Sequence, residues 1–236
     1  MIGTLLKFLV IAIVTIPIAL VEIFVSLVDR SGKSFHVVGR FWSWIILTLY
    51  GIRVSVEGTE HLDPSKRYIY VSNHASMFDI PAVLTGIPDE IRIVMKKELT
   101  RIPFFGWAMA VGPYIVIDRF HAKDAVKGLE RAAERIRNGA SVFLFAEGTR
   151  TLDGKLQPFK RGAFALASKS GVPIIPVAIN NTFGILPKGS KVVRPAHITV
   201  VLDRPIPTEG VEGKQGEMKL MEEVHRAIAK NYIDQS

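Results

Sequence analysis

The sequence predicts an α/β fold preceded by two N-terminal helices that associate with a membrane. From Tyr68 onward, short apolar runs alternate with longer polar and apolar mixtures, as expected for strands interleaved with helices. The first thirty residues are the most apolar part of the chain and carry no charge between Phe8 and Val21. With 236 residues and no internal repeat, one domain with an appendage is expected. We therefore divide the chain into a helical membrane-associating segment, 1–54, and an α/β domain, 55–236.

Six apolar runs of the domain are expected to form strands. They are residues 68–72, 91–95, 114–117, 141–145, 172–179 and 197–202. Pro173 and Pro176 cannot donate backbone hydrogen bonds, so the fifth run is predicted to lie at a sheet edge or to contain a bulge. Helical spacing of apolar residues predicts helices over 121–139, 161–171 and 214–233.

The first apolar segment is long enough for a membrane helix. At about 1.5 Å per residue, a helix from Ile2 to Val28 could cross a hydrocarbon core of roughly 30 Å. Pro17 and Glu22 make that crossing imperfect. A secretory signal peptide fits less well, because Lys7 alone is a thin basic region and no A-x-A cleavage site follows.

A second, shorter apolar stretch, 41–52, carries tryptophans and a tyrosine suited to a membrane interface. Arg30, Lys33 and Arg40 lie between the two stretches, which places that connection on the cytoplasmic side. We expect a two-helix anchor in the cell's inner membrane, with the active site on the cytoplasmic face. The alternative is a pair of buried helices in a soluble core.

Charge and cysteine content narrow the chemistry. The formal charge of +8 favours anionic partners: nucleic acid, an anionic membrane surface or a phosphorylated substrate. The chain has no cysteine, which excludes disulfides, thiolate nucleophiles and cysteine-based zinc sites. Its basic residues are scattered rather than gathered on one helix, so no nucleic-acid partner is expected.

The stretch "VSNHASMFD" contains a candidate catalytic pair, His74 and Asp79. A neutral imidazole can take a proton from an alcohol when a carboxylate fixes its tautomer. Continuous helix would place the two side chains about 140° apart, so contact requires a turn. Asp79 followed by Ile80 and Pro81 resembles a helix N-cap, which leaves 73–78 as a strand-to-helix connection. The alternative is an exposed histidine beside a capping aspartate.

Cations follow several predicted strands. Glu147, Gly148, Thr149 and Arg150 come directly after one strand in "FAEGTR". Ligands of open α/β sheets bind at the carboxyl ends of strands, and arginine can hold a phosphate through two parallel hydrogen bonds. The alternative is a glycine turn with a surface Glu-Arg pair.

Arg119 and Lys96 also follow predicted strands and could face the same anion. A P-loop pattern is absent, which argues against cleavage of a nucleotide phosphate.

Read in order, "NHASMFD", "GPYIVIDR", "FAEGTR" and "VPIIPV" resemble the four sequence blocks of the glycerolipid acyltransferases, most closely the 1-acylglycerol-3-phosphate acyltransferases. The resemblance covers roughly 68–182. It implies a mixed, largely parallel sheet flanked by helices. Two positions depart from the family pattern: Ala146 replaces the usual proline of the third block, and Val116 replaces an aromatic residue of the second.

The resemblance also implies roles for individual residues. His74 would act as general base and Asp79 would orient it. The glycerol phosphate would be bound by Lys96, Arg119, Glu147, Gly148, Thr149 and Arg150. No metal or cofactor is expected.

The resemblance implies acyl transfer to the sn-2 hydroxyl of 1-acyl-sn-glycerol-3-phosphate (lysophosphatidic acid), giving phosphatidic acid. The donor would be an acyl-CoA or acyl-ACP thioester, and the lipid bilayer would be a further partner. Two alternatives stay open: an acyltransferase with another glycerolipid or aminolipid acceptor, and a non-enzymatic membrane adaptor that binds phosphatidic acid.

Overall fold

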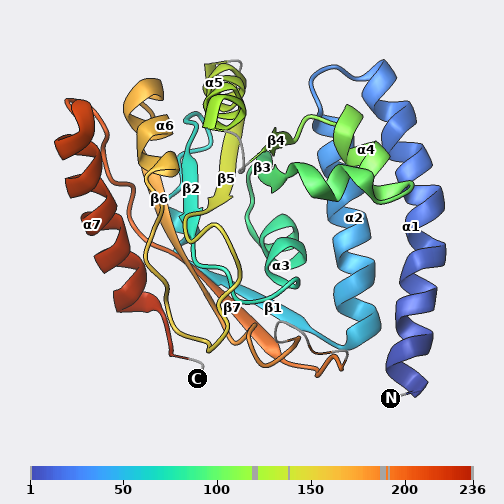
Figure 1. Cartoon of the computed structure of the whole chain (residues 1–236). Helices are drawn as coiled ribbons and strands as arrows, with labels where there is room; N and C mark the ends of the chain where they lie inside the picture. Colours follow the sequence, from blue (N-terminus) through green and yellow to red (C-terminus); the bar gives the residue numbers. More distant parts are fainter. Residues whose placement is uncertain (1, 119–121, 138, 187–189, 191, 235–236) are drawn as a thin grey trace.

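The computed structural model describes residues 2–118, 122–137, 139–186, 190 and 192–234 (Figure 1). Its centre is a seven-stranded sheet with the order β1-β7-β6-β2-β5-β3-β4. The strands are β1 Arg53–Glu57, β2 Ile69–Ser72, β3 Ile91–Lys96, β4 Ile115–Ile117, β5 Ser141–Phe145, β6 Ile174–Asn180 and β7 His197–Leu202. The helices are α1 Ile2–Val28, α2 Lys33–Tyr50, α3 Asp79–Gly86, α4 Phe105–Val111, α5 Ala122–Arg137, α6 Gly162–Ser170 and α7 Gly213–Asn231, with two 3-10 helices, η1 Thr59–His61 and η2 Lys97–Arg101.

The sheet is mixed and largely parallel, as the family resemblance implied. Among the described strands, only β6 and β7 pair in antiparallel fashion. All six predicted strands are present, and the three predicted helices correspond to α5, α6 and α7. β1 and α4 were not predicted, because each is short and lies next to a longer apolar segment that dominated the pattern.

The prediction that the prolines place β6 at a sheet edge is wrong. β6 lies between β2 and β7, well inside the sheet. On the side of β6 that faces β2, Pro176 is paired with Val71. On the opposite side, its carbonyl accepts a hydrogen bond of 2.9 Å from the Asp203 N–H, and the β7 ladder begins only at Val177. Pro176 is therefore tolerated where the antiparallel ladder has ended and no donor is needed.

Two hydrophobic cores cover the two faces of the sheet (Figure 1). One face packs against α2 and α3, and its core includes Tyr70, Phe143 and Ile179. The other packs against α5, α6 and α7 and includes Val71 and Leu144. Neighbouring residues of one strand thus point into different cores, which explains why the buried strands read as continuous apolar runs.

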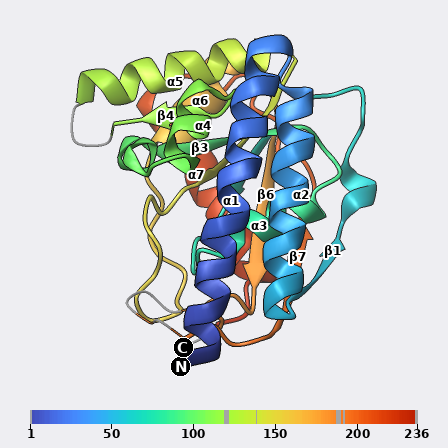
Figure 2. The same ribbon diagram turned by 90° about the vertical axis from the view of Figure 1, so that its right-hand side faces the viewer.

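The first two helices form an antiparallel hairpin beside the sheet (Figure 2). Within the described residues, α1 is the one helix long and apolar enough to cross a membrane. α2 differs, because Ile46, Leu47 and Tyr50 on one of its faces belong to the same core as the sheet. Its Arg40 donates hydrogen bonds to the carbonyl groups of Ile87 and Thr85, at 2.8 and 2.9 Å, and so holds α2 against α3. The two helices are therefore not equivalent, and α2 is packed on the domain.

Candidate active site

His74 and Asp79 are in direct contact in the loop after β2. The Nδ1 atom of His74 lies 2.7 Å from Oδ2 of Asp79. The same oxygen accepts hydrogen bonds from the backbone N–H groups of Ala75 and Ser76, at 2.8 and 2.9 Å. Asp79 is fully buried, whereas 17% of the His74 side chain is exposed. Because Oδ2 is an acceptor, Nδ1 carries the proton of a neutral imidazole, and Nε2 is left as the basic atom.

The turn that this contact requires is present. Residues 73–78 lie between β2 and α3 and are not helical until Asp79, which is the first residue of α3. The N-cap is Phe78 and not Asp79 as expected, and Phe78 makes no side-chain cap bond. Asp79 instead reaches back to the N–H groups of the preceding turn, which places its negative charge at the helix N-terminus. One carboxylate thus both closes the turn and orients His74.

The histidine ring is also held by its face. It stacks on Phe145, at the end of β5, with ring centroids 3.9 Å apart and an interplanar angle of 14°. The backbone carbonyl of His74 accepts a hydrogen bond of 2.9 Å from the Thr151 N–H. The ring can therefore turn little, and Nε2 keeps a fixed direction.

Asn73 anchors the loop from the other side, a role that the sequence did not indicate. Its Nδ2 donates to the carbonyl of Ile179 at 3.0 Å, and its Oδ1 accepts from the Ile179 N–H at 2.8 Å. The β2–β6 ladder ends at Ser72 and Val177, and beyond it the Asn73 side chain takes the place of a backbone partner for Ile179. The sequence shows an asparagine next to the histidine, but the partner of this asparagine, Ile179 of β6, could not be known without the strand order.

The third sequence block lies beside the dyad, since Ser72 of β2 is in register with Phe145 of β5. Gly148 has a φ of 74°, and a Cβ there would lie 2.9 Å from the Lys160 side chain, so glycine suits this turn. Thr149 is exposed and Arg150 half-buried, while Glu147 is buried.

Ala146, in the family's proline position, donates its N–H to the Ser72 carbonyl at 3.0 Å. A proline could not make this bond. The departure from the family pattern therefore adds a backbone contact between β5 and β2.

Of the other predicted phosphate ligands, Lys96 is exposed at the end of β3. Arg119 lies outside the described residues. The roles of Lys96, Gly148, Thr149 and Arg150 therefore stay predictions. Within the described part of the chain, no three acidic or histidine side chains gather as a metal site would require.

Two serines and several N–H groups near the dyad are already engaged. Ser72 and Ser76 are fully buried, so neither can act as a nucleophile towards a ligand in its present position. The N–H groups of Ala75 and Ser76 are bound to Asp79, and that of Gly148 donates to Phe145. An oxyanion-stabilising donor would have to come from other groups.

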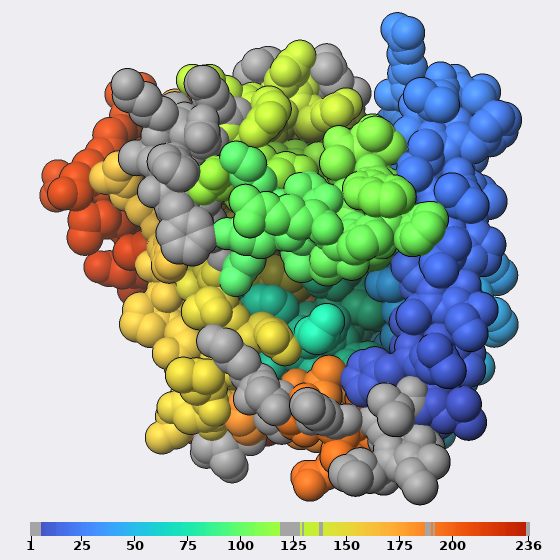
Figure 3. Space-filling view, turned by 45° about the vertical axis from the view of Figure 1, so that its right-hand side comes forward, coloured from blue at the N-terminus to red at the C-terminus, as the bar shows by residue number. Residues whose placement is uncertain are grey.

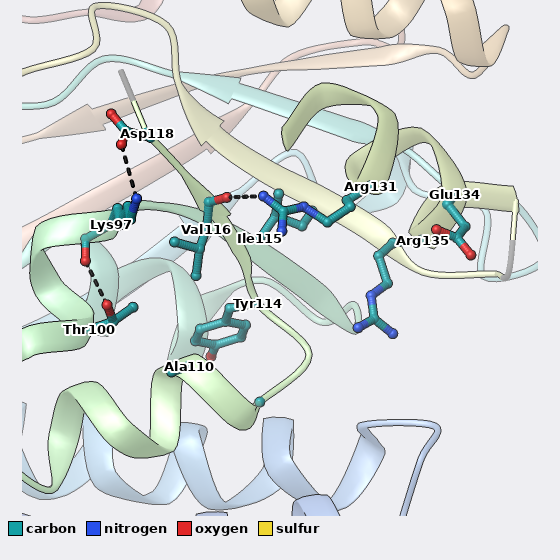
Figure 4. Close-up of a pocket in the computed structure, with 11 residues that line it drawn as sticks. Lys97, Thr100, Ala110, Tyr114, Ile115, Val116, Asp118, Arg131, Glu134 and Arg135 are labelled. Carbon is teal, nitrogen blue, oxygen red and sulfur yellow. Dashed lines mark hydrogen bonds and ion pairs between the residues drawn. The ribbon is translucent and has the colours of Figure 1, made fainter. Parts of the chain in front are cut away.

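Figure 3 shows a hollow on the face that presents the β2–α3 segment, which contains the dyad. The hollow is bounded by α1, by the green segment of η2 and α4, and by the yellow segment near residue 150, with the turquoise β2–α3 region at its floor. A separate cavity of about 650 Å³ lies along the edge strand β4, and α5 and η2 contribute to its walls (Figure 4). Arg131 and Arg135 line that cavity, which includes none of the described predicted site residues.

The comparisons with known proteins agree on one class. A family model described as Acyltransferase matches residues 53–180, which include the dyad and the third block. A sheep 1-acyl-sn-glycerol-3-phosphate acyltransferase alpha is 32% identical over 205 residues, which cover 86% of this chain and 69% of the relative. The chain belongs to the acyltransferase family.

Individual relatives narrow the class. A chloroplastic 1-acyl-sn-glycerol-3-phosphate acyltransferase of Brassica napus is 36% identical over 186 residues, 78% of this chain and 54% of the relative. The chain thus spans about half the length of that relative. A 1-acyl-sn-glycerol-3-phosphate acyltransferase of Pseudomonas aeruginosa is 37% identical, over 72% of this chain and 66% of the relative. The crystal structure of the 1-acyl-sn-glycerophosphate acyltransferase PlsC from Thermotoga maritima matches with a TM-score of 0.81 and 28% identity, covering 98% of this chain and 95% of that one.

The contact with Asp79 predicts that neutral His74 carries its proton on Nδ1. Nitrogen-15 NMR of protein labelled at histidine, compared with the His74→Asn variant to assign the signal, should show Nδ1 protonated and Nε2 unprotonated. Asp79→Asn should shift the balance between the tautomers. A neutral His74 protonated mainly on Nε2 would contradict this geometry.

Proposed function

We propose that this protein transfers a fatty acyl group from an acyl thioester to the sn-2 hydroxyl of 1-acyl-sn-glycerol-3-phosphate, giving phosphatidic acid. The observation that carries the proposal is the His74–Asp79 contact at 2.7 Å, which leaves Nε2 basic and directed by packing. The names of the relatives supply the acceptor, since those compared act on 1-acyl-sn-glycerol-3-phosphate. An acyl-CoA or acyl-ACP thioester supplies the acyl group.

The reaction proceeds by a single displacement. Nε2 of His74 takes the proton of the acceptor hydroxyl while its oxygen attacks the thioester carbonyl. Asp79 stabilises the imidazolium that forms, because its buried Oδ2 faces Nδ1. The tetrahedral intermediate then expels the thiolate, which takes the proton from Nε2 and leaves as a thiol. No enzyme cysteine exists to carry the acyl group.

One prediction of the proposed function concerns the base. His74→Ala should lower kcat/KM by roughly a thousandfold or more, because the hydroxyl loses its proton acceptor. The assay uses purified protein in detergent, lysophosphatidic acid and an acyl thioester, with monoacylglycerol and lysophosphatidylcholine as competing acceptors.

His197→Ala is the matched control, since His197 is exposed on β7 and its imidazole contacts the Ser55 hydroxyl at 3.0 Å. Equal turnover by wild type and His74→Ala would exclude His74 as the base. Binding of phosphatidic acid without any transfer would favour the non-enzymatic adaptor.

Another prediction concerns the acceptor phosphate. A hydrogen bond to a charged group contributes about 1.5 to 3 kcal/mol, so Arg150→Ala should raise KM for lysophosphatidic acid roughly 10-fold to 100-fold. With monoacylglycerol, which has no phosphate, the same change should have little effect. Arg226→Ala, on the exposed face of α7, is the control. An unchanged KM for lysophosphatidic acid would remove Arg150 from the phosphate site.

Membrane association is part of the proposal. α1 exposes a band of large apolar side chains that includes Leu9, Ile13 and Phe24. Arg30 and Lys33 are exposed at the turn between α1 and α2. Basic residues are enriched in cytoplasmic connections, which supports a cytoplasmic position for this turn at the inner membrane. Arg40 contributes less to this asymmetry than the sequence suggested, because its guanidinium binds backbone carbonyl groups inside the protein.

This exposed band predicts that the protein resists extraction by alkaline carbonate. Replacing Leu9, Ile13 and Phe24 together with asparagine should move it to the supernatant, because apolar burial in lipid contributes about 25 cal/mol per Å². Immunoblots of pellet and supernatant measure the change. Wild-type protein found entirely in the supernatant would contradict insertion of α1.

A further inference from the structure

Glu147 lies beneath the catalytic loop and not on the surface of the hollow. Only 3% of the residue is exposed. Its carboxyl group accepts hydrogen bonds from the backbone N–H groups of His74 and Gln157. It therefore joins the histidine loop to the distant end of the loop between β5 and α6.

The backbone of His74 is thereby held on both sides by one segment. Its N–H donates to Glu147, and its carbonyl accepts from the N–H of Thr151 at 2.9 Å. The ring of His74 stacks on Phe145, two residues before Glu147. Residues 145–151 thus set both the main chain and the ring face of the histidine, while Asp79 sets the direction of Nδ1.

The surroundings of Glu147 favour the uncharged acid. Burial raises the pKa of Glu147 to about 8, and the charge of Asp79 acts in the same direction, while the two N–H groups lower it in part. Oε2 of Glu147 and Oδ1 of Asp79 are both buried without a hydrogen-bond partner among the described residues. Two neighbouring buried carboxylates disfavour each other's ionisation. Asp79 has three donors on Oδ2 to stabilise its charge, so the proton belongs on Glu147.

Asp79 is the charged group that acts on Glu147, and it favours the uncharged acid. The Lys160 side chain lies beside the neighbouring Gly148. Tyr232, after α7, has a pKa raised to about 12, first by burial and then by several acidic groups around it, so it stays neutral near pH 7. Glu147 is buried, so it has no access to the acceptor phosphate. If it were anionic, its charge would also repel that phosphate.

We infer that Glu147 is a positioning residue for His74, which it holds through the backbone as an uncharged carboxylic acid, and that it is not a ligand of the acceptor phosphate. This inference rests on the proposed function, because the histidine that it positions is the proposed base. It separates Glu147 from Lys96 and Arg150, whose cationic side chains suit the phosphate.

Kinetics of two variants test the role. Glu147→Ala should lower kcat by roughly a hundredfold, because a displacement of about 1 Å at the base can cost that much. Glu147→Gln should restore most of that turnover, because the amide oxygen can accept the same two N–H groups without a charge. KM for lysophosphatidic acid should change less than kcat in both variants.

A glutamine variant as impaired in kcat as the alanine variant would overturn the inference. A glutamine variant with normal kcat and a KM for lysophosphatidic acid raised tenfold would also overturn it, since that result would mean that the Glu147 carboxylate binds the substrate.

Stability against pH tests the uncharged acid without any enzymatic assay. The folded state holds the Glu147 proton up to a pKa of about 8, whereas the usual value is 4.5, so the unfolded chain releases it earlier. The stability that this group contributes is therefore present below pH 4.5 and is lost as the pH rises towards 8. Thermal midpoints measured from pH 5 to 9 should fall less with pH in Glu147→Gln than in wild type.

Glu222→Gln, exposed on α7, is the matched control and should follow the wild-type curve. Parallel curves for wild type and Glu147→Gln would overturn the uncharged state. If wild type transfers no acyl group to any acceptor, the proposed function fails, whereas the comparison of thermal midpoints still decides the charge of Glu147. Failure of the proposed function and failure of the inference about Glu147 are thus distinguishable. The thermal comparison does not use Glu147→Ala, so it decides the question even if that variant does not fold.

Discussion

Three donors converge on one oxygen of Asp79, and the geometry of the site depends on this convergence. Oδ2 receives Nδ1 of His74 and the N–H groups of Ala75 and Ser76. A carboxylate removed from water needs such donors to keep its charge. The same bonds force residues 73–78 into a turn, so the chain cannot continue as helix from His74 to Asp79. Electrostatic compensation of one buried charge therefore determines the local backbone, and the backbone brings the histidine into contact.

The position of β2 in the sheet brings distant parts of the chain to this turn. β2 pairs with β5 on one side and with β6 on the other. Because Ser72 is in register with Phe145, the residues that follow β5 meet the residues that follow β2. Asn73 ties the same turn to β6 through Ile179. The carboxyl ends of the parallel strands β2 and β5 thus bring together the proposed base, its orienting groups and a cation-bearing loop.

Patterns local in the sequence were predicted well, and contacts that depend on strand order were not. The buried strands were visible as apolar runs, and the need for a turn between His74 and Asp79 followed from helical geometry alone. The central place of Pro176 could not be foreseen, because it depends on where the β7 ladder ends. The burial of Glu147 was equally hidden, since its spacing beside Arg150 resembles that of an exposed ion pair. The burial of the two side chains in the folded chain separates them, since Glu147 is 3% exposed and Arg150 is half-buried.

The packing of the N-terminal hairpin connects the exposed apolar surface of α1 to the dyad without a linker. Phe8 of α1 makes an edge contact with Tyr50 of α2, with ring centroids 6.0 Å apart. Tyr50 makes a second edge contact, at 5.4 Å, with Phe78, the residue before Asp79. Packed aromatic rings of this kind add about 0.5 to 1.5 kcal/mol per pair beyond their burial, and they leave little room for relative rotation. The orientation of α1 and that of the catalytic turn are therefore coupled. A bilayer that fixes α1 would also fix the direction from which an acceptor hydroxyl approaches Nε2 of His74.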